Sequence, residues 1–273
     1  MLISLREKFS KYMEAMNKMS DKGWKVVTYK DIEGESEDNT TEEKVGEEEP
    51  KKVKKESRPL IWGDLNSRAF WKRNIFPVLF QAAFLILVLN CNPSDGIYIH
   101  FFFYLVLFCY YLITKSFTFR NLRRNMSSGS RFWTTSMGCS LVFALTIGAT
   151  VALTFISPKL KLGMYPLIHT STIDVVIFAI TTMFLAPIVE ETFYRGNMIN
   201  LESKKLRAVT TVASILLFAI LHSYSWWGIL CAAIWAIPLT LTFIKTRNVY
   251  VTMVAHFFVS LLINIPIMIS FLQ

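Results

Sequence analysis

Residues 187–196 read PIVEETFYRG, and they place two adjacent carboxylates, Glu190 and Glu191, at the end of an apolar run that begins near Ile173. Charged side chains are rare inside segments apolar enough for a membrane, where they need partners and commonly mark a functional site. The carboxylate pair therefore predicts that the surrounding chain is a membrane domain. It also predicts that other segments of that domain supply the partners of the pair.

The distribution of apolar residues supports a membrane domain. The chain has 273 residues, of which 53% are hydrophobic, and a soluble domain is also about half apolar. Here, however, residues 1–74 are polar and charged, whereas residues 75–273 hold most of the long apolar runs. This segregation predicts an all-α fold, a polytopic membrane helical bundle that follows a polar, partly disordered cytoplasmic tail.

The net charge of +9 could indicate nucleic-acid binding, but the positions of the cations argue against it. Much of the basic excess flanks apolar runs, where Lys and Arg set the orientation of spans and contact anionic lipid. The four cysteines include no CxxC pair, so neither a disulfide framework nor a thiolate metal site is predicted. We expect a protein of the lipid bilayer that binds no nucleic acid.

The polar tail divides into two parts. Residues 1–30 form an amphipathic segment, because apolar side chains recur there at spacings of four and three. Its apolar face could lie on the inner membrane surface, or it could pack on a partner or on the protein's own domain. Residues 31–70 form a linker that begins with an acidic stretch and continues with a basic one, a composition typical of disorder. The predicted membrane domain then occupies residues 71–273.

About seven apolar runs follow, most of them near the length that a membrane helix needs. They cover residues 75–90, 97–113, 132–156, 172–195, 208–221, 226–244 and 249–272. Basic connections at residues 115–131, 202–207 and 245–248 predict the cytoplasmic side of a cell membrane, with the amino terminus inside and the carboxyl terminus outside. An eighth span, or a re-entrant piece near residues 194–205, remains an alternative.

Two histidines are candidate partners for the carboxylates. His222 ends one apolar run and His256 lies in another, so the three segments can converge only if their helices pack together. Measured along ideal helices from the nearest basic loops, Glu190 and His222 lie roughly 20–25 Å deep, whereas His256 lies only about 13 Å deep. A tilt, a kink or a re-entrant segment must therefore bring them to one level.

Helical spacing assigns different tasks to the two carboxylates. Glu191 and Arg195 are four residues apart, and on a helix they share a face with the acid on the amino-terminal side, so Arg195 can neutralise Glu191. Glu190 is turned about 100° away and is free to face a cavity. We therefore expect one structural carboxylate and one that does chemistry.

Two chemistries fit the remaining arrangement, in which Ser260 and Asn264 share a helix stripe with His256. Glu190 with His222 could hold and deprotonate a water while His256 donates to a developing oxyanion. Alternatively, a glutamate and two histidines could bind zinc and leave one position open for water. The chain has no HExxH sequence, so the usual helix of a zinc protease is absent.

Three motifs resemble the CAAX protease and bacteriocin-processing family, an intramembrane protease group that includes type II CAAX prenyl endopeptidases. The family pattern is EExxxR, then FxxxH, then HxxxN or a similar polar residue. The corresponding positions here are Glu190-Glu191-x-x-x-Arg195, Phe218-x-x-x-His222 and His256-x-x-x-Ser260. The resemblance covers a core of about residues 172–264.

The resemblance implies an intramembrane endopeptidase with a cavity that opens within the bilayer. Its substrates would be membrane-associated peptides or prenylated proteins, cleaved by a glutamate-activated water. By position, Glu190 is the base, His222 helps to hold the water, and His256 stabilises the oxyanion. The supporting residues are Glu191, Arg195, Ser260 and Asn264. No catalytic metal is expected, with zinc as the alternative cofactor.

Two other functions compete with that of a protease. The family also includes bacteriocin self-immunity proteins and membrane regulators, so the alternative is a non-catalytic membrane scaffold or immunity protein with the same fold. An ion or small-molecule transporter would also use buried carboxylates. A transporter should show a repeat between the two halves of its sequence, and we see no convincing repeat here.

Overall fold

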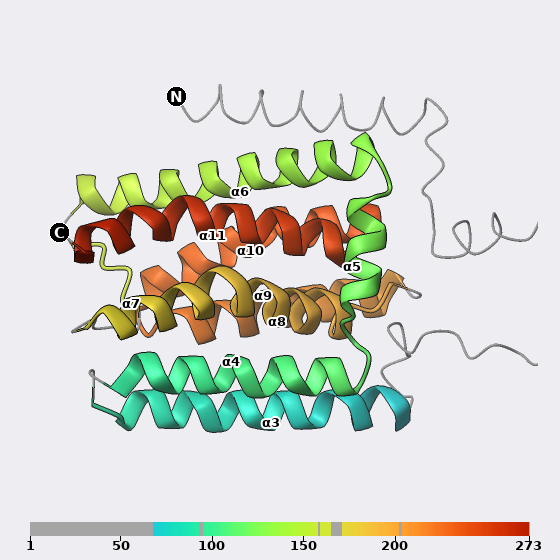
Figure 1. Ribbon diagram of the computed structural model, residues 1–273, viewed down its shortest axis with the longest axis horizontal. Helices are drawn as coiled ribbons and strands as arrows, with labels where there is room; N and C mark the ends of the chain where they lie inside the picture. Colours follow the sequence, from blue (N-terminus) through green and yellow to red (C-terminus); the bar gives the residue numbers. More distant parts are fainter. Residues whose placement is uncertain (1–67, 93–94, 158, 165–170, 202–203, 273) are drawn as a thin grey trace, which may run out of the picture. The chain divides into compact units, whose positions relative to one another are not determined.

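The computed structural model describes residues 68–92, 95–157, 159–164, 171–201 and 204–272. Regular structure in these ranges is helical, apart from an isolated bridge between Met164 and Ser223. The predicted all-α fold is therefore confirmed (Figure 1). In chain order the elements are α3 (Arg68–Asn90), α4 (Gly96–Ile113), α5 (Phe119–Met126), α6 (Ser130–Ile156), α7 (Thr172–Ala179), the π-helical turn η4 (Ile180–Leu185), α8 (Ala186–Glu190), the π-helical turn η5 (Glu191–Asn197), α9 (Lys204–His222), α10 (Trp226–Thr246) and α11 (Val249–Leu272).

Six helical segments in the described ranges are long and apolar enough to cross a membrane. They are α4, α6, the segment Thr172–Asn197, α9, α10 and the Val249–Ser270 part of α11. The apolar part of α3, Asn74–Asn90, is shorter. Each lies on one of the predicted apolar runs, so the chain is a multi-pass membrane protein.

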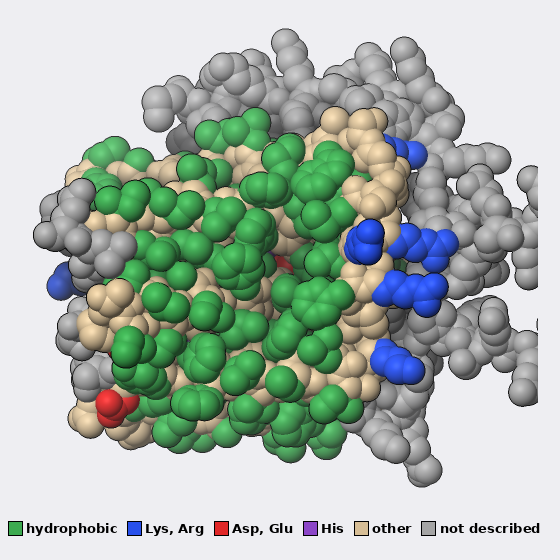
Figure 2. Space-filling model, in the orientation of Figure 1, with side chains coloured by type: hydrophobic (Ala, Val, Ile, Leu, Met, Phe, Trp, Pro, Cys, Tyr) green, Lys and Arg blue, Asp and Glu red, His purple; other side chains and the backbone are tan. Residues whose placement is uncertain are grey.

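The surface of the bundle fits a lipid environment. Large apolar side chains point outward, including Phe155, which is 83% exposed, and Ile113, which is 80% exposed. Figure 2 shows hydrophobic side chains over most of the visible face, while most of the visible Lys and Arg gather at the end marked by α5. This arrangement is what helices need when their outer faces contact acyl chains and their basic ends contact water.

The predicted divisions of the amino-terminal tail fall mainly outside the described residues. The amphipathic segment at residues 1–30 lies outside them, as does the linker from residue 31 to residue 67. Helix α3 begins at Arg68, so the last three residues of the linker predicted at 31–70 are helical.

The segment from α7 to η5 lies in the interior of the bundle. It packs against both α4 and α11, and η5 also contacts α9. Helix α9 packs on α10, helix α11 packs on α6 and α10, and α3 packs on α4. Three helices, α4, α9 and α11, therefore pack against the segment that carries the carboxylate pair.

Local sequence explains how this segment begins and bends. Ser171 and Asp174 form a capping box, in which each side chain accepts a hydrogen bond from the backbone N–H of the other, so the helix begins at Thr172. Pro187 in the first turn of α8 has no N–H to donate, which removes one bond of the regular ladder. The turns on both sides of α8 widen to π-helix, and one wide turn closes with Met198 N–H donating to Phe193 O at 3.0 Å.

Helix α9 places Glu190 far from the basic loop at the start of that helix. Glu190 lies beside His222, the last residue of α9. Helix α9 has 19 residues, so its last residue lies about 27 Å from its first at 1.5 Å per residue. His256 reaches the same place, with its Nε2 4.0 Å from Glu190 Oε2. The segment that carries Glu190 is not straight to its end, because its helix ends at Asn197 and residues 198–201 continue without regular structure.

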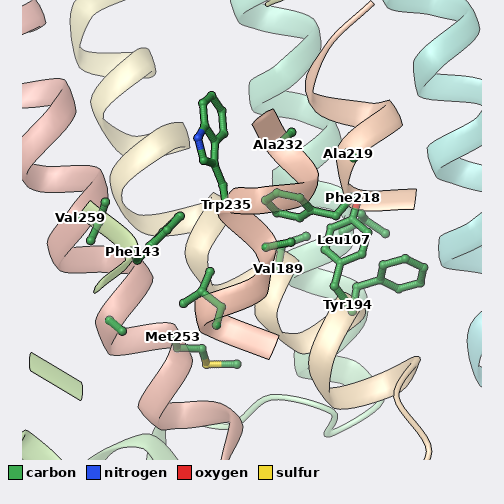
Figure 3. Close-up of a cluster of buried hydrophobic side chains, with 14 of the residues drawn as sticks. Leu107, Phe143, Val189, Tyr194, Phe218, Ala219, Ala232, Trp235, Met253 and Val259 are labelled. Carbon is green, nitrogen blue, oxygen red and sulfur yellow. The ribbon is translucent and has the colours of Figure 1, made fainter. Parts of the chain in front are cut away.

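A buried apolar core surrounds the carboxylate pair. Leu107 of α4, Val189 of α8, Tyr194 of η5 and Phe218 of α9 belong to one cluster of buried side chains, shown in Figure 3. One polar group within this core, the Tyr194 hydroxyl, donates to Gln81 at 2.9 Å. The charged groups described below are therefore enclosed largely by apolar side chains.

Candidate active site

The structure brings Glu190, Glu191, His222 and His256 together from three separate segments. Glu190 ends α8 and Glu191 begins η5, while His222 is the last residue of α9 and His256 lies on α11. Glu190 Oε2 lies 3.6 Å from His222 Nε2 and 4.0 Å from His256 Nε2. One carboxylate oxygen therefore faces both imidazole rings.

The two oxygens of Glu190 have different surroundings. Oε1 accepts a short hydrogen bond from the hydroxyl of Tyr104 on α4. Oε2 is buried and has no direct hydrogen-bond partner among the described residues, although it faces the two histidines. Buried carboxylate oxygens are normally paired, so an oxygen left in this position is suited to bind a small donor such as water.

Glu191 makes the ion pair with Arg195 that the spacing predicted. Its Oε1 accepts a hydrogen bond from Arg195 Nη1 at 2.9 Å, and both side chains are almost completely buried. The guanidinium also donates from Nη2 to the carbonyl of Ala236 at 3.3 Å and lies 4.9 Å from the centre of the Phe218 ring. The pair thus ties η5 to α9 and α10.

The same Glu191 oxygen also holds His256. His256 Nδ1 lies 3.0 Å from Glu191 Oε1. Since an ionised carboxylate only accepts hydrogen bonds, Nδ1 carries a hydrogen and donates it. This bond directs Nε2 of the ring toward Glu190, and Glu191 therefore positions a candidate catalytic side chain as well as neutralising Arg195.

His222 is oriented by its own helix. Its Nδ1 lies 2.7 Å from the carbonyl oxygen of Phe218, one turn earlier, and its ring stacks on the Phe218 ring at 3.9 Å between centres. A carbonyl can only accept, so Nδ1 is again the donor and Nε2 faces Glu190. The FxxxH spacing thus supplies both the carbonyl and the ring that hold this histidine.

A cavity lies beside Glu190 and His222. The space in it that is open to a water-sized sphere is about 20 Å³, and roughly 10–15 Å³ on this measure holds one water. Gln81, Tyr104, Glu190, Tyr194 and His222 provide its polar groups, and apolar side chains provide the rest of its wall. A water molecule could therefore lie beside the carboxylate.

The last two supporting candidates lie near the site without joining its hydrogen-bond network. Ser260 is buried on α11. Asn264 donates from Nδ2 to the backbone carbonyl of Ser260 at 2.8 Å. Within the described residues, no hydrogen bond connects either side chain to Glu190 or His256. The supporting role of Ser260 and Asn264 stays a prediction.

Tyr104 is the site residue that the sequence reasoning missed. A tyrosine hydroxyl in an apolar helix needs a hydrogen-bond partner, so a signal existed. Helix α4 carries four tyrosines, however, and no motif separates Tyr104 from the other three. Its partner lies 86 positions away in the chain. Only the packing of α4 against α8 identifies it.

The charged cluster is not arranged as a metal site. The described part of the chain contains no group of three or more His, Cys, Asp or Glu side chains placed to hold a metal ion. Glu190, His222 and His256 are the side chains that the zinc alternative would use. Their facing atoms are the Oε2 and the two Nε2 atoms described above.

Comparison with known proteins gives a match to a segment in the second half of the chain. A family model described as type II CAAX prenyl endopeptidase Rce1-like matches residues 172–262. No match was found among curated proteins or among solved structures. The matched segment contains Glu190, His222 and His256, whereas α3 to α6 lie outside it. The match confirms the predicted resemblance, and at the level of the family it supports an intramembrane protease of the CAAX type.

Proposed function

We propose that this chain, whose residues 172–262 match the Rce1-like type II CAAX prenyl endopeptidase family, is an endopeptidase that hydrolyses peptide bonds with a water activated by Glu190. The observation that carries the proposal is the surroundings of Glu190 Oε2. This buried oxygen has no direct hydrogen-bond partner among the described residues and faces the Nε2 atoms of His222 and His256 at 3.6 and 4.0 Å.

The first step is the activation of water. A water beside Glu190 Oε2 can donate one hydrogen to this oxygen and the other to the bare Nε2 of a neutral His222 ring. Its oxygen lone pair is then free to attack a substrate carbonyl. Glu190 takes the proton as the new C–O bond forms, so the carboxylate becomes a carboxylic acid.

The second step is the stabilisation and collapse of the tetrahedral intermediate. His256 donates from Nε2 to the oxyanion when its ring carries both hydrogens, and the negative charge of Glu191 beside Nδ1 offsets the charge of that ring. Glu190 returns its proton to the leaving amine as the C–N bond breaks. The products are a carboxylic acid and an amine, which exchange a proton to become a carboxylate and an ammonium group, and Glu190 is again ionised.

The substrate class follows from the membrane domain and the matched family. We propose that the substrates are membrane-associated peptides or prenylated proteins, that the protein lies in the cell membrane with its amino terminus in the cytoplasm, and that no metal takes part. The basic end of the bundle shown in Figure 2 supports this orientation, because cations favour the cytoplasmic side.

The test uses purified full-length protein in detergent and an internally quenched peptide with a prenylated CAAX sequence. Glu190→Gln keeps an oxygen that can accept from Tyr104 but removes the base, so kcat should fall by about 10²–10⁴-fold. His222→Ala should also lose most activity. The matched control is Asp95→Asn, which makes the same chemical change on an exposed residue outside the site and should leave kcat unchanged.

Three results would count against the proposal. Wild-type protein that does not cleave the prenylated peptide would exclude this substrate class. Glu190→Gln protein that cleaves it at the wild-type rate would exclude the glutamate mechanism. If Glu190→Gln and His222→Ala both kept full biological function in cells, the non-catalytic scaffold would be the better description.

A further inference from the structure

We infer that Tyr104 is a positioning residue that holds one oxygen of Glu190 and thereby reserves the other for catalysis. This inference rests on the proposed function, and it extends the site to α4, which lies outside the matched segment 172–262. The Tyr104 hydroxyl donates to Glu190 Oε1, while Oε2 faces His222 and His256.

The position of Tyr104 is set by the packing of α4. Its neighbours Phe103 and Leu107 are buried in the core, and the rings of Phe103 and Tyr104 meet edge to face with centres 5.1 Å apart. Tyr104 also lines the cavity beside Glu190 and His222. The hydroxyl is therefore presented by a side chain that is itself held in place.

A glutamate needs such a partner because its terminal torsion is soft. Rotation about the last side-chain bond has broad, roughly two-fold preferences, so the two carboxylate oxygens can exchange places or tilt. A base must keep its oxygen aligned with the water and the carbonyl, since small displacements of reacting groups lower rates strongly. With Oε1 held by Tyr104, Oε2 alone can receive the proton, and its direction is fixed.

Helix α4 provides a matched control for this hydroxyl. Tyr98 lies on the same helix and also donates to a carboxylate, with its hydroxyl 2.6 Å from Asp174 Oδ1. Asp174 belongs to the cap of α7, where it accepts from Ser171 N–H. Tyr98→Phe and Tyr104→Phe therefore make the same change on the same helix, and they differ in which carboxylate loses its donor.

The experiment measures kcat and KM of both variants with the prenylated peptide, together with their thermal unfolding midpoints. We expect Tyr104→Phe to lower kcat by about 10- to 100-fold, the scale of a lost hydrogen bond to a charged group. Its KM should stay within about twofold, because the change acts on the transition state. Tyr98→Phe should leave kcat and KM at wild-type values, although its unfolding midpoint falls.

The outcomes separate this inference from the proposed function. If Glu190→Gln is inactive while Tyr104→Phe has wild-type kcat, Tyr104 has no positioning role and the proposed function stands. If Tyr98→Phe and Tyr104→Phe lose kcat equally, the loss reflects a weakened α4, and the inference is overturned. If wild-type protein cleaves nothing, the proposed function fails, and the positioning role of Tyr104 fails because it depends on that function.

The contact itself can be tested without activity. Unfolding free energies of wild type, Tyr104→Phe, Glu190→Leu and the double variant form a cycle. Residues in direct contact give effects that do not add, so the double variant should be more stable than the sum of the single losses implies. Additive losses would show that the hydroxyl and the carboxylate do not interact.

Discussion

Replacement of Arg195 by methionine should destabilise the protein more than almost any other single change in the bundle. Arg195 and Glu191 have side chains that are only 1% and 0% exposed, and their facing atoms are 2.9 Å apart. Methionine fills much of the same space but supplies no hydrogen-bond donor. The variant therefore leaves the carboxylate of Glu191 buried without its cation.

The magnitude follows from the burial of both partners. Breaking a buried ion pair by removing one member costs about 3–5 kcal/mol, because an uncompensated charge remains in a low-dielectric interior. This corresponds to roughly a 100- to 5000-fold loss in the folding equilibrium constant. The contact between Arg195 and the Phe218 ring, about 0.5–2 kcal/mol in other proteins, is lost in the same change.

A double variant isolates the effect of the stranded charge. Glu191→Met together with Arg195→Met leaves neither charge buried, and apolar replacement of a whole buried pair is often nearly neutral. The double variant still leaves the Nδ1–H of His256 without its acceptor, which should lower the free energy of unfolding by about 1–3 kcal/mol. The double variant should thus be more stable than Arg195→Met alone, yet it should have low activity because His256 is no longer oriented.

Unfolding in mixed micelles, followed through the seven tryptophans, measures these differences. Lys245→Met is the control, because it makes the same chemical change on an exposed residue of α10 and should alter stability by no more than about 0.5 kcal/mol. Our reasoning would be refuted if Arg195→Met were as stable as Lys245→Met, or if the double variant were less stable than Arg195→Met.

Three further predictions concern packing, cofactor and orientation. Gly228→Ala should lower the free energy of unfolding by about 1–3 kcal/mol in the same assay, because the new methyl would lie 1.7 Å from the carbonyl oxygen of Leu162. The control is Gly148→Ala, whose methyl meets no atom within 4 Å and should not destabilise the protein. Equal stability of the two variants would contradict this packing. Exhaustive dialysis against a chelator should leave cleavage of the prenylated peptide intact, whereas a loss of activity that zinc restores would establish the zinc alternative. The orientation can be tested with single cysteines, introduced into a variant without native cysteines, in sealed right-side-out vesicles. A membrane-impermeant thiol reagent should label Lys161→Cys, on the predicted outer side, at once, and Ser127→Cys, in a predicted cytoplasmic loop, only after permeabilisation. The reverse pattern would contradict a cytoplasmic amino terminus.

The sequence was informative wherever a property depends on near neighbours in the chain. The apolar runs predicted the helices, and four-residue spacing predicted that Glu191 and Arg195 face each other, as they do at 2.9 Å. The rarity of charge in apolar segments directed attention to Glu190, His222 and His256. Each inference used only the period of a helix or the cost of a buried charge, which are local properties.

The remaining features depend on packing between distant segments or on small changes of helical phase. The bond from Tyr104 to Glu190 requires α4 to lie against α8, and nothing near Tyr104 in the sequence encodes that neighbour. The π-helical turns beside α8 alter which side chains face inward, and a regular helical period does not anticipate them. Asn264 was predicted as a supporting residue from its helix stripe, and the donation of its amide to the backbone one turn earlier could not be read from that stripe.

The shared oxygen of Glu191 has a consequence for how this protein can change over evolutionary time. Oε1 accepts from both Arg195 and His256, so under the proposed function selection for a folded protein and selection for hydrolysis act on the same atom. A lineage that gave up hydrolysis would be free to replace Glu190 and Tyr104, but it would still need Glu191 beside Arg195. A descendant with an intact Glu191–Arg195 pair and an altered residue at position 190 would therefore carry the signature of a protein that kept the fold and lost the reaction.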